Sequence, residues 1–275
     1  MHLSAAEIKD WVELILRWTH VFAGILWVGA TFYFTWLDGR FTELEVSAKK
    51  NPGQEPEKFV WMVHSGGFYL VEKQKTPQLQ TQTLHWFKWE AAITWLSGFL
   101  LFGAMFYDRG MLVNFEDAPL SKGPAIGLSL GMIAVGWLVY DLLWKFCRKD
   151  LLGVVISYAL IVLAAYVSFR YFSGRGAYME MGAIFGTIMT ANVWMRILPA
   201  QRRMVAALRA GTPPNLAEGA QAKKRSKHNT FIVVPVVFIM ISNHYPSTYG
   251  SPHAWEILSG LVLVGWAAAK IVRRA

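Results

Sequence analysis

Long apolar stretches separated by polar segments dominate the pattern of the chain. Each stretch is close to the length of about 20 mostly apolar residues that a bilayer-spanning helix needs. The pattern predicts an all-α fold, a polytopic integral membrane helical bundle of about seven transmembrane helices, in a single membrane domain over residues 1–275. The predicted spans are Trp11 to Leu37, Trp86 to Tyr107, Pro124 to Lys145, Leu151 to Phe172, Tyr178 to Leu198, Thr230 to Tyr245 and Ala254 to Ile271.

Two of the segments between the spans, residues 38–85 and 199–229, are too long to be simple connectors. In the first, apolar and aromatic arms flank Ser65-Gly66-Gly67, which predicts either a β-hairpin or a folded-back loop. The aromatic content of these arms favours an ordered loop. The second segment opens with a predicted helix from Pro199 to Ala210, followed by a Gly-Thr-Pro-Pro turn and a basic run that leads to His228.

The composition agrees with a membrane protein. Of the 275 residues, 54% are hydrophobic and 16% are charged, whereas roughly 25% are charged in an average soluble domain. This balance excludes a disordered chain and argues against an ordinary soluble enzyme. The single cysteine, Cys147, cannot form an intrachain disulfide, and the sequence has neither the paired CxxC of a zinc site nor the CxxCH of a covalently attached haem.

The net charge of +9 is distributed unevenly between the two sides of the predicted membrane domain. Of the 27 Lys and Arg residues, 21 lie in the segments that follow the first, third, fifth and seventh spans or at the span ends that border these segments. Positive residues favour the cytoplasm, so we expect residues 38–85 and 199–229 to be cytoplasmic loops, with the N-terminus outside and the C-terminus inside. The expected location is a bacterial-type inner (cell) membrane, and the positive excess is explained without nucleic acid as a partner.

Histidines within or beside the apolar spans are candidate ligands of a haem iron. Neutral imidazole is a good ligand for haem, and ionisable groups inside a membrane are functional candidates. His20 in the first span and His244 at the end of the sixth lie at similar predicted depth, so a bis-His haem b is allowed, with His253 as the reserve ligand. The alternatives are a core His20 bonded to a carbonyl and ordinary interfacial positions for His244 and His253.

A second group of candidate residues lies on the predicted cytoplasmic side. His64 is next to Gly66 and Gly67, and these glycines allow the backbone to approach a bound ligand closely. His85 and Lys88 are three residues apart and are expected on one face at the start of the second span. The remaining candidates are Trp89, Glu90, His228 and Asn229.

Each of these charged candidates also has an ordinary structural explanation. Lys88 and Glu90 are placed to act as interfacial anchors, and the basic run from Lys223 to Lys227 is typical of a topology signal beside anionic lipid. Asp141 and Lys145 are four residues apart and are expected to pair. Three further polar residues inside the spans receive no role: Glu180, Asn192 and Arg196.

Five motifs in this order resemble the membrane domain of cytochrome-c-coupled urate oxidase (urate hydroxylase), and the resemblance extends over nearly the whole chain. They are Arg17 to Gly29 (RWTHVFAGILWVG), His64 to Tyr69, His85 to Glu90, Arg225 to Asn229 and Ser242 to Pro246. The resemblance implies oxidation of urate with water to 5-hydroxyisourate. It also implies that the electrons pass through haem b to cytochrome c, without production of hydrogen peroxide.

The sequence differs from the long members of that family, which carry a further membrane helix and a cytochrome c domain. We expect no C-terminal cytochrome c domain here, so a separate cytochrome c or another acceptor is implied. The hypothesis gives catalytic roles to His85, Lys88, Glu90 and His228, and substrate binding to His64, Gly66, Gly67, Trp89 and Asn229. Two alternatives remain open: a haem b electron-transfer or haem-handling membrane protein with another substrate or partner, and a non-catalytic membrane module.

Overall fold

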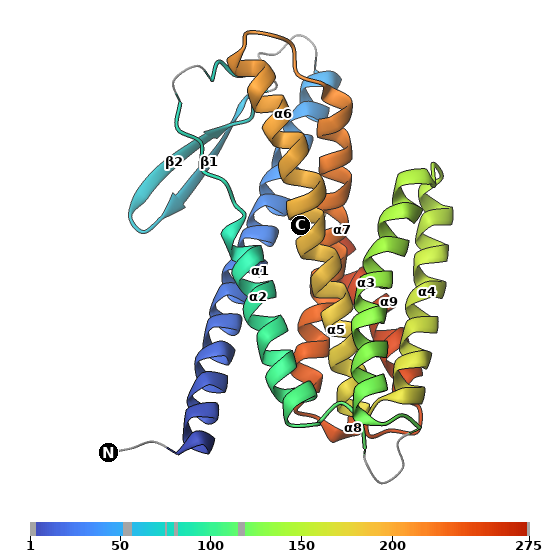
Figure 1. Cartoon of the computed structure of the whole chain (residues 1–275). Coiled ribbons are helices and arrows are strands. Elements are labelled where there is room, and N and C mark those ends of the chain that lie inside the picture. The colour runs from blue at the N-terminus through green and yellow to red at the C-terminus, as the bar shows by residue number, and fades with distance from the viewer. Residues whose placement is uncertain (1–3, 52–56, 75, 80–81, 115–118, 274–275) are drawn as a thin grey trace.

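The computed structural model describes residues 4–51, 57–74, 76–79, 82–114 and 119–273. Helices dominate, and a two-stranded sheet accompanies them (Figure 1). The elements in chain order are α1 (Ala5–Lys50), β1 (Phe59–His64), β2 (Gly67–Glu72), α2 (Trp89–Phe102), η1 (Gly103–Asp108), α3 (Lys122–Phe146), α4 (Asp150–Tyr171), α5 (Gly174–Ala191), η2 (Asn192–Ile197), α6 (Leu198–Arg209), α7 (Leu216–Ser242), α8 (Pro246–Tyr249) and α9 (Ala254–Val272).

The prediction of a helical membrane bundle is confirmed. Among the described residues, six helices are long and apolar enough to cross a membrane: α1, α2 with η1, α3, α4, the continuous helix from α5 to α6, and α9. The remaining predicted span, Thr230 to Tyr245, falls largely in the second half of α7, whose first half is polar. Helix α7 packs within the bundle, but it is not among the six helices that are apolar enough along their length to cross a membrane.

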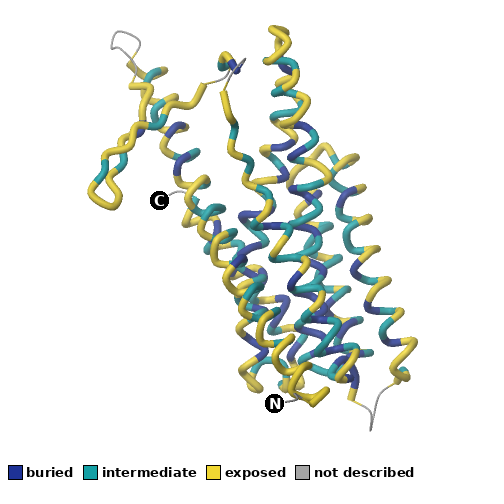
Figure 2. Tube along the Cα trace, turned by 60° about the vertical axis from the view of Figure 1, so that its left-hand side comes forward, coloured by how far each residue is buried: buried dark blue, intermediate teal, exposed yellow. Residues whose placement is uncertain are grey.

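Helix α5 lies at the centre of the bundle and forms most of its core. Tyr178, Met181 and Phe185 on this helix are almost fully buried against α3, α4, α7 and α9. In contrast, outward-facing apolar side chains are exposed on α3 and α4, as Leu138 and Val155 are. Exposed positions cover the outer faces of the helices in Figure 2, as expected for helices whose outer faces contact lipid.

Helix α1 is much longer than the predicted span and continues beyond Leu37 to Lys50. Asp38 lies within this helix, and its carboxylate is 2.5 Å from the Lys73 ammonium after β2 and 2.8 Å from that of Lys223 on α7. The polar second part of α1 is thus held by the hairpin and by α7. The hairpin, α6 and the start of α7, which belong to segments predicted to be cytoplasmic, lie toward the same end of the molecule (Figure 1).

The apolar arms around Ser65-Gly66 form a β-hairpin, as the sequence indicated. Strands β1 and β2 are antiparallel, and both residues of the turn have positive φ angles, 50° at Ser65 and 76° at Gly66. Two consecutive positive φ angles are characteristic of the tight turn that matches the twist of a hairpin. Val60 on β1 packs against Leu37 and Phe41, which attaches the hairpin to α1.

The segment 199–229 was expected to be mainly a loop and is instead mainly helical. Helix α6 extends α5 and η2 to Arg209, and α7 begins at Leu216, where the Asn215 side chain accepts a hydrogen bond from the Ala217 amide. Only a short turn separates the two helices. His228 and Asn229 are therefore held on a regular helix inside the bundle.

Candidate functional site

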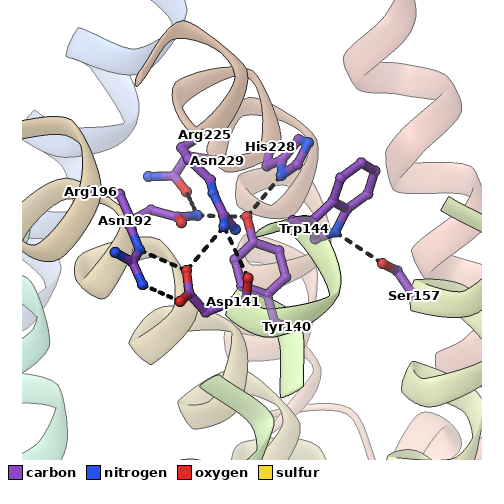
Figure 3. Close-up of polar contacts among 9 residues, drawn as sticks. All are labelled: Tyr140, Asp141, Trp144, Ser157, Asn192, Arg196, Arg225, His228 and Asn229. Carbon is purple, nitrogen blue, oxygen red and sulfur yellow. Dashed lines mark hydrogen bonds and ion pairs between the residues drawn. The ribbon is translucent and has the colours of Figure 1, made fainter. Parts of the chain in front are cut away.

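A buried carboxylate joins three elements at one end of the bundle. Asp141 on α3 accepts hydrogen bonds from Arg196 on η2 and from Arg225 on α7 (Figure 3). The Arg196 Nε lies 2.8 Å from Asp141 Oδ1, and the Arg225 Nη2 lies 3.0 Å from the same oxygen. The Asp141 side chain is 8% exposed and that of Arg225 is 9% exposed. The expected pair of Asp141 with Lys145 is wrong, because arginines from two other helices take the carboxylate.

Two asparagines extend this network toward α5. Asn192, which is fully buried, donates from Nδ2 to the Tyr140 hydroxyl and to Asn229 Oδ1, both at 2.9 Å. Asn229 in turn donates to the Met189 carbonyl at 3.0 Å. Asn192 begins the π-helical turn η2, and such turns occur frequently at functional sites.

Two atoms of this network have no partner among the described residues: Arg225 Nη1, a donor, and Asn192 Oδ1, an acceptor. An unpaired buried polar group costs about 1–3 kcal/mol, so its retention needs an explanation. Both residues approach Tyr140, since the Arg225 guanidinium lies 5.0 Å from its ring and Asn192 bonds to its hydroxyl. The network therefore keeps a buried cationic donor and a buried amide acceptor, without protein partners in the described part of the chain, close to an aromatic ring.

His228 connects the network to the aromatic side chains of α3. Its Nδ1 lies 2.8 Å from the Tyr140 hydroxyl, and its ring lies 4.2 Å from that of Trp144. Because the Tyr140 oxygen accepts from Asn192, its O–H can donate to Nδ1, which leaves the ring proton on Nε2. Burial, followed by the nearby Arg225 and Lys224 cations, lowers the pKa of His228 to about 3. His228 is therefore neutral at pH 7 and able to accept a proton.

The lowered pKa of His228 predicts an acid sensitivity of the fold. The unfolded chain takes up a proton on His228 near its ordinary pKa of 6.5, whereas the native protein does so only near 3. Native stability therefore falls as the pH drops below 6.5. His228→Gln should lose less stability than the wild type when thermal unfolding in detergent is compared at pH 7.5 and at pH 4.5. Parallel losses in the two proteins would contradict this assignment.

The sequence-predicted site residues fall into three groups. His228 and Asn229 lie together in the buried network. His64, Gly66 and Gly67 form the tip of the hairpin, where His64 is exposed and bonds to the Ser65 hydroxyl at 2.6 Å. Their substrate-binding role stays a prediction.

The third group precedes and opens α2. This helix begins at Trp89, so His85 and Lys88 do not share a helical face as expected. The exposed ring of His85 packs edge-on against Phe87 instead. Lys88 lies with its ammonium 5.2 Å from the Trp89 ring and 5.9 Å from the Trp194 ring, and Glu90 is half-buried in the first helical turn.

The candidate haem ligands lie on different elements of the described part of the chain. His20 faces α2, where its Nδ1 lies 2.8 Å from the Thr94 carbonyl oxygen, an arrangement that leaves Nε2 free to bind a metal. His244 is exposed after the end of α7, and His253 is exposed with its Nδ1 3.3 Å from Glu256 Oε1. The described residues contain no group of three or more His, Cys, Asp or Glu side chains suited to a metal ion. The Nδ1 of His20 is fixed by a backbone carbonyl, and the bis-His haem b stays a prediction.

Gly98 allows His20 to lie against α2. A Cβ atom at Gly98 would lie 2.6 Å from His20 Cε1, whereas one at Gly29 meets nothing within 4 Å. Because the His20 ring is held by Thr94, Gly98→Ala should cost about 1–3 kcal/mol of unfolding free energy, as overpacking does. Gly29→Ala, the control, should be neutral or slightly stabilising in detergent unfolding. Equal stabilities of the two variants would show that this contact is not tight.

Four residues of the network were not predicted to have a role: Tyr140, Asn192, Arg196 and Arg225. Arg225 was assigned to the basic topology signal, but it is buried, unlike the exposed Lys223 and Lys227. The sequence did contain one indication of a role for these residues. An amide and cationic side chains lie within or beside apolar helices, where unpaired polar groups are costly. Nothing in the local spacing revealed that these residues meet.

Comparison with known families decides the relationship of the chain. The family described as "Urate oxidase N-terminal" matches residues 6–273. The chain belongs to this urate oxidase N-terminal family. The match includes both the hairpin and the buried network, and it agrees with the resemblance seen in the sequence motifs. Neither the curated proteins nor the solved structures give a match to the chain. The family indicates a function related to urate oxidation in a membrane setting.

Proposed function

We propose that the protein is a membrane-bound urate oxidoreductase that binds urate at the buried Arg225–Asn192 pair. It oxidises urate with water to 5-hydroxyisourate and passes two electrons to an acceptor other than oxygen. The observation that carries the binding site is the unpaired donor and acceptor beside Tyr140. Membership of the urate oxidase N-terminal family supports urate as the substrate.

The chemistry of this pair suits urate. Urate is a planar anion whose edge alternates carbonyl oxygens with N–H groups. The Arg225 guanidinium can donate from Nη1 to a carbonyl oxygen and balance the negative charge, while Asn192 Oδ1 can accept from a neighbouring N–H. The Tyr140 ring supplies an aromatic surface next to both groups. Asp141 and Asn229 hold the two binding residues from behind.

Proton removal is the second requirement of the reaction. Oxidation of urate with water to 5-hydroxyisourate releases two electrons and two protons in all: the electrons leave urate, and water then adds to the oxidised purine. Neutral His228 is a suitable base, because it is linked to the site through the Tyr140 hydroxyl and is unprotonated at pH 7. His85, Lys88 and Glu90 remain proposed catalytic residues, and His64, Gly66, Gly67 and Trp89 remain proposed contacts of an outer part of the site.

The acceptor and the cofactor are part of the proposal. A separate cytochrome c would take electrons outside the membrane, and haem b would relay them, with His20 as the better-oriented ligand because Thr94 fixes its Nδ1. The end of the bundle with the urate site faces the cytoplasm of a bacterial-type inner membrane in this proposal, with the N-terminus outside. The basic segments that lie toward that end support this orientation.

The test uses purified protein in lipid nanodiscs under anaerobic conditions, with ferricyanide as the acceptor. Urate consumption with reduction of two ferricyanide ions per urate supports the proposal. A visible spectrum of the same sample, before and after dithionite, tests haem b separately. No urate consumption in folded protein, with or without haem present, would contradict the proposed activity.

A further inference from the structure

A cavity of about 510 Å³ lies between α3, α4, α5, α7 and α9. Most of its wall is apolar, with Met132, Ile161, Phe185 and Trp266 among the lining residues. Its volume is in the range of about 300–1,000 Å³ that is typical of pockets for small molecules and cofactors. The unpaired atoms of the proposed urate site belong to Arg225 and Asn192, neither of which lines this cavity. It is therefore a second candidate binding site.

The hydrogen-bonding groups of the cavity gather at the end that adjoins the buried network. Tyr140, Trp144, Ser157 and His228 line this end. The Trp144 indole donates to the Ser157 hydroxyl at 3.1 Å, and the Tyr140 hydroxyl is engaged with Asn192 and with His228 Nδ1 (Figure 3). His228 Nε2–H is then left as a donor. The polar end therefore suits a neutral ligand group with a carbonyl oxygen.

The cavity also reaches the outer surface of the membrane helices. Among its lining residues, Val135 on α3 is 55% exposed and Leu163 on α4 is 57% exposed. Both helices are apolar membrane-spanning candidates. A ligand dissolved in the bilayer can therefore enter from the side, with an apolar tail along the wall and a polar head beside His228.

We propose that this cavity binds an isoprenoid quinone, which accepts the electrons of urate oxidation. The inference rests on the proposed function and names the first acceptor of the electrons, ahead of haem b and cytochrome c. A quinone combines a ring bearing carbonyl oxygens with a single apolar tail, which matches one hydrogen-bonding end and an apolar wall. Lys224 and Lys227 also line the cavity, and Lys224 pairs with Asp150 at 2.6 Å, so a phospholipid is the competing occupant that the experiment has to exclude.

The reaction balances with this acceptor. Urate, water and quinone give 5-hydroxyisourate and quinol: a C–O bond forms at the purine, two electrons pass from urate to the quinone, and the two released protons end on the quinone oxygens. Hydrogen bonds run from Asn192 through the Tyr140 hydroxyl to His228, so the two sites are directly linked. Tyr140 and His228 thus provide a route for protons between substrate and acceptor.

The experiment uses the protein in nanodiscs with ubiquinone-1 as the probe. Binding is measured by equilibrium dialysis without urate, and urate-driven reduction is measured anaerobically with ubiquinone-1 or with ferricyanide. Val154 on α4 lines the cavity, whereas its neighbour Val155 is 57% exposed and does not. Val154→Phe should weaken ubiquinone-1 binding about tenfold and lower the ratio of quinone to ferricyanide reduction by a similar factor. Val155→Phe should leave both unchanged.

The outcomes separate this inference from the proposed function. Urate oxidation with ferricyanide, but no saturable binding or reduction of ubiquinone-1, would overturn the quinone site alone. Saturable binding of ubiquinone-1 that Val154→Phe weakens would support the quinone site. If the same protein oxidised no urate with any acceptor, the proposed urate oxidation would be ruled out. The quinone site would also be overturned if the purified protein held phospholipid in the cavity and no ubiquinone-1. Equal effects of Val154→Phe and Val155→Phe would overturn it as well. If Val154→Phe fails to fold, Leu160→Phe in the same wall replaces it.

Discussion

Arg225→Gln should lower kcat/KM for urate about 100-fold, which corresponds to about 2.7 kcal/mol of lost transition-state stabilisation. The change removes the buried cation and the unpaired Nη1 that the account assigns to urate. A hydrogen bond to a charged group contributes about 1.5–3 kcal/mol, so loss of this one interaction explains most of the effect. The measurement is anaerobic urate turnover with ferricyanide in folded, monodisperse protein.

Arg196→Gln is the matched control for this variant. Arg196 binds the same carboxylate of Asp141, but its side chain is 43% exposed. Unlike Arg225, it has no buried nitrogen that lacks a hydrogen-bond partner among the described residues. Its replacement should change kcat/KM less than about tenfold. Similar losses in Arg225→Gln and Arg196→Gln would show that both act only through Asp141, and wild-type turnover in Arg225→Gln would remove Arg225 from the urate site.

Asp141→Ala should destabilise the protein by about 3–5 kcal/mol, because it leaves the buried Arg225 guanidinium without its carboxylate. The loss is measured as a change in unfolding free energy in detergent. Asp150→Ala is the control, since Asp150 pairs with Lys224 but its side chain is 77% exposed. An exposed pair contributes about 0–1 kcal/mol. Equal effects of the two variants would show that the Asp141 network does not stabilise the bundle.

The membrane bundle and the hairpin could be predicted because their signals are local. Apolar length marks a membrane helix, and Ser65-Gly66 can adopt the positive φ angles of a tight turn. The start of α7 was missed for a physical reason. The segment from Leu216 to Lys227 is polar, which suggested a loop, but it is rich in Ala, Glu, Gln, Lys and Arg, the residues with the highest helix propensity.

The candidate site was predicted only in part, because its contacts join distant segments. His228 and Asn229 were identified from their motif. Asp141 was assigned to Lys145, the partner that local helical spacing favours, but α5 with η2 and α7 bring Arg196 and Arg225 to it across the bundle. Such pairings depend on how helices pack, and no periodicity in a single segment encodes them.

The central claim is that urate binds at Arg225 and Asn192. A cryo-electron microscopy structure of the protein in nanodiscs with urate, prepared anaerobically and without an acceptor, tests it most directly. We expect the purine ring beside Tyr140, with a carbonyl oxygen within hydrogen-bond distance of Arg225 Nη1 and an N–H directed at Asn192 Oδ1. Urate bound between Lys88 and the hairpin instead, with both buried atoms still unpaired, would contradict the account.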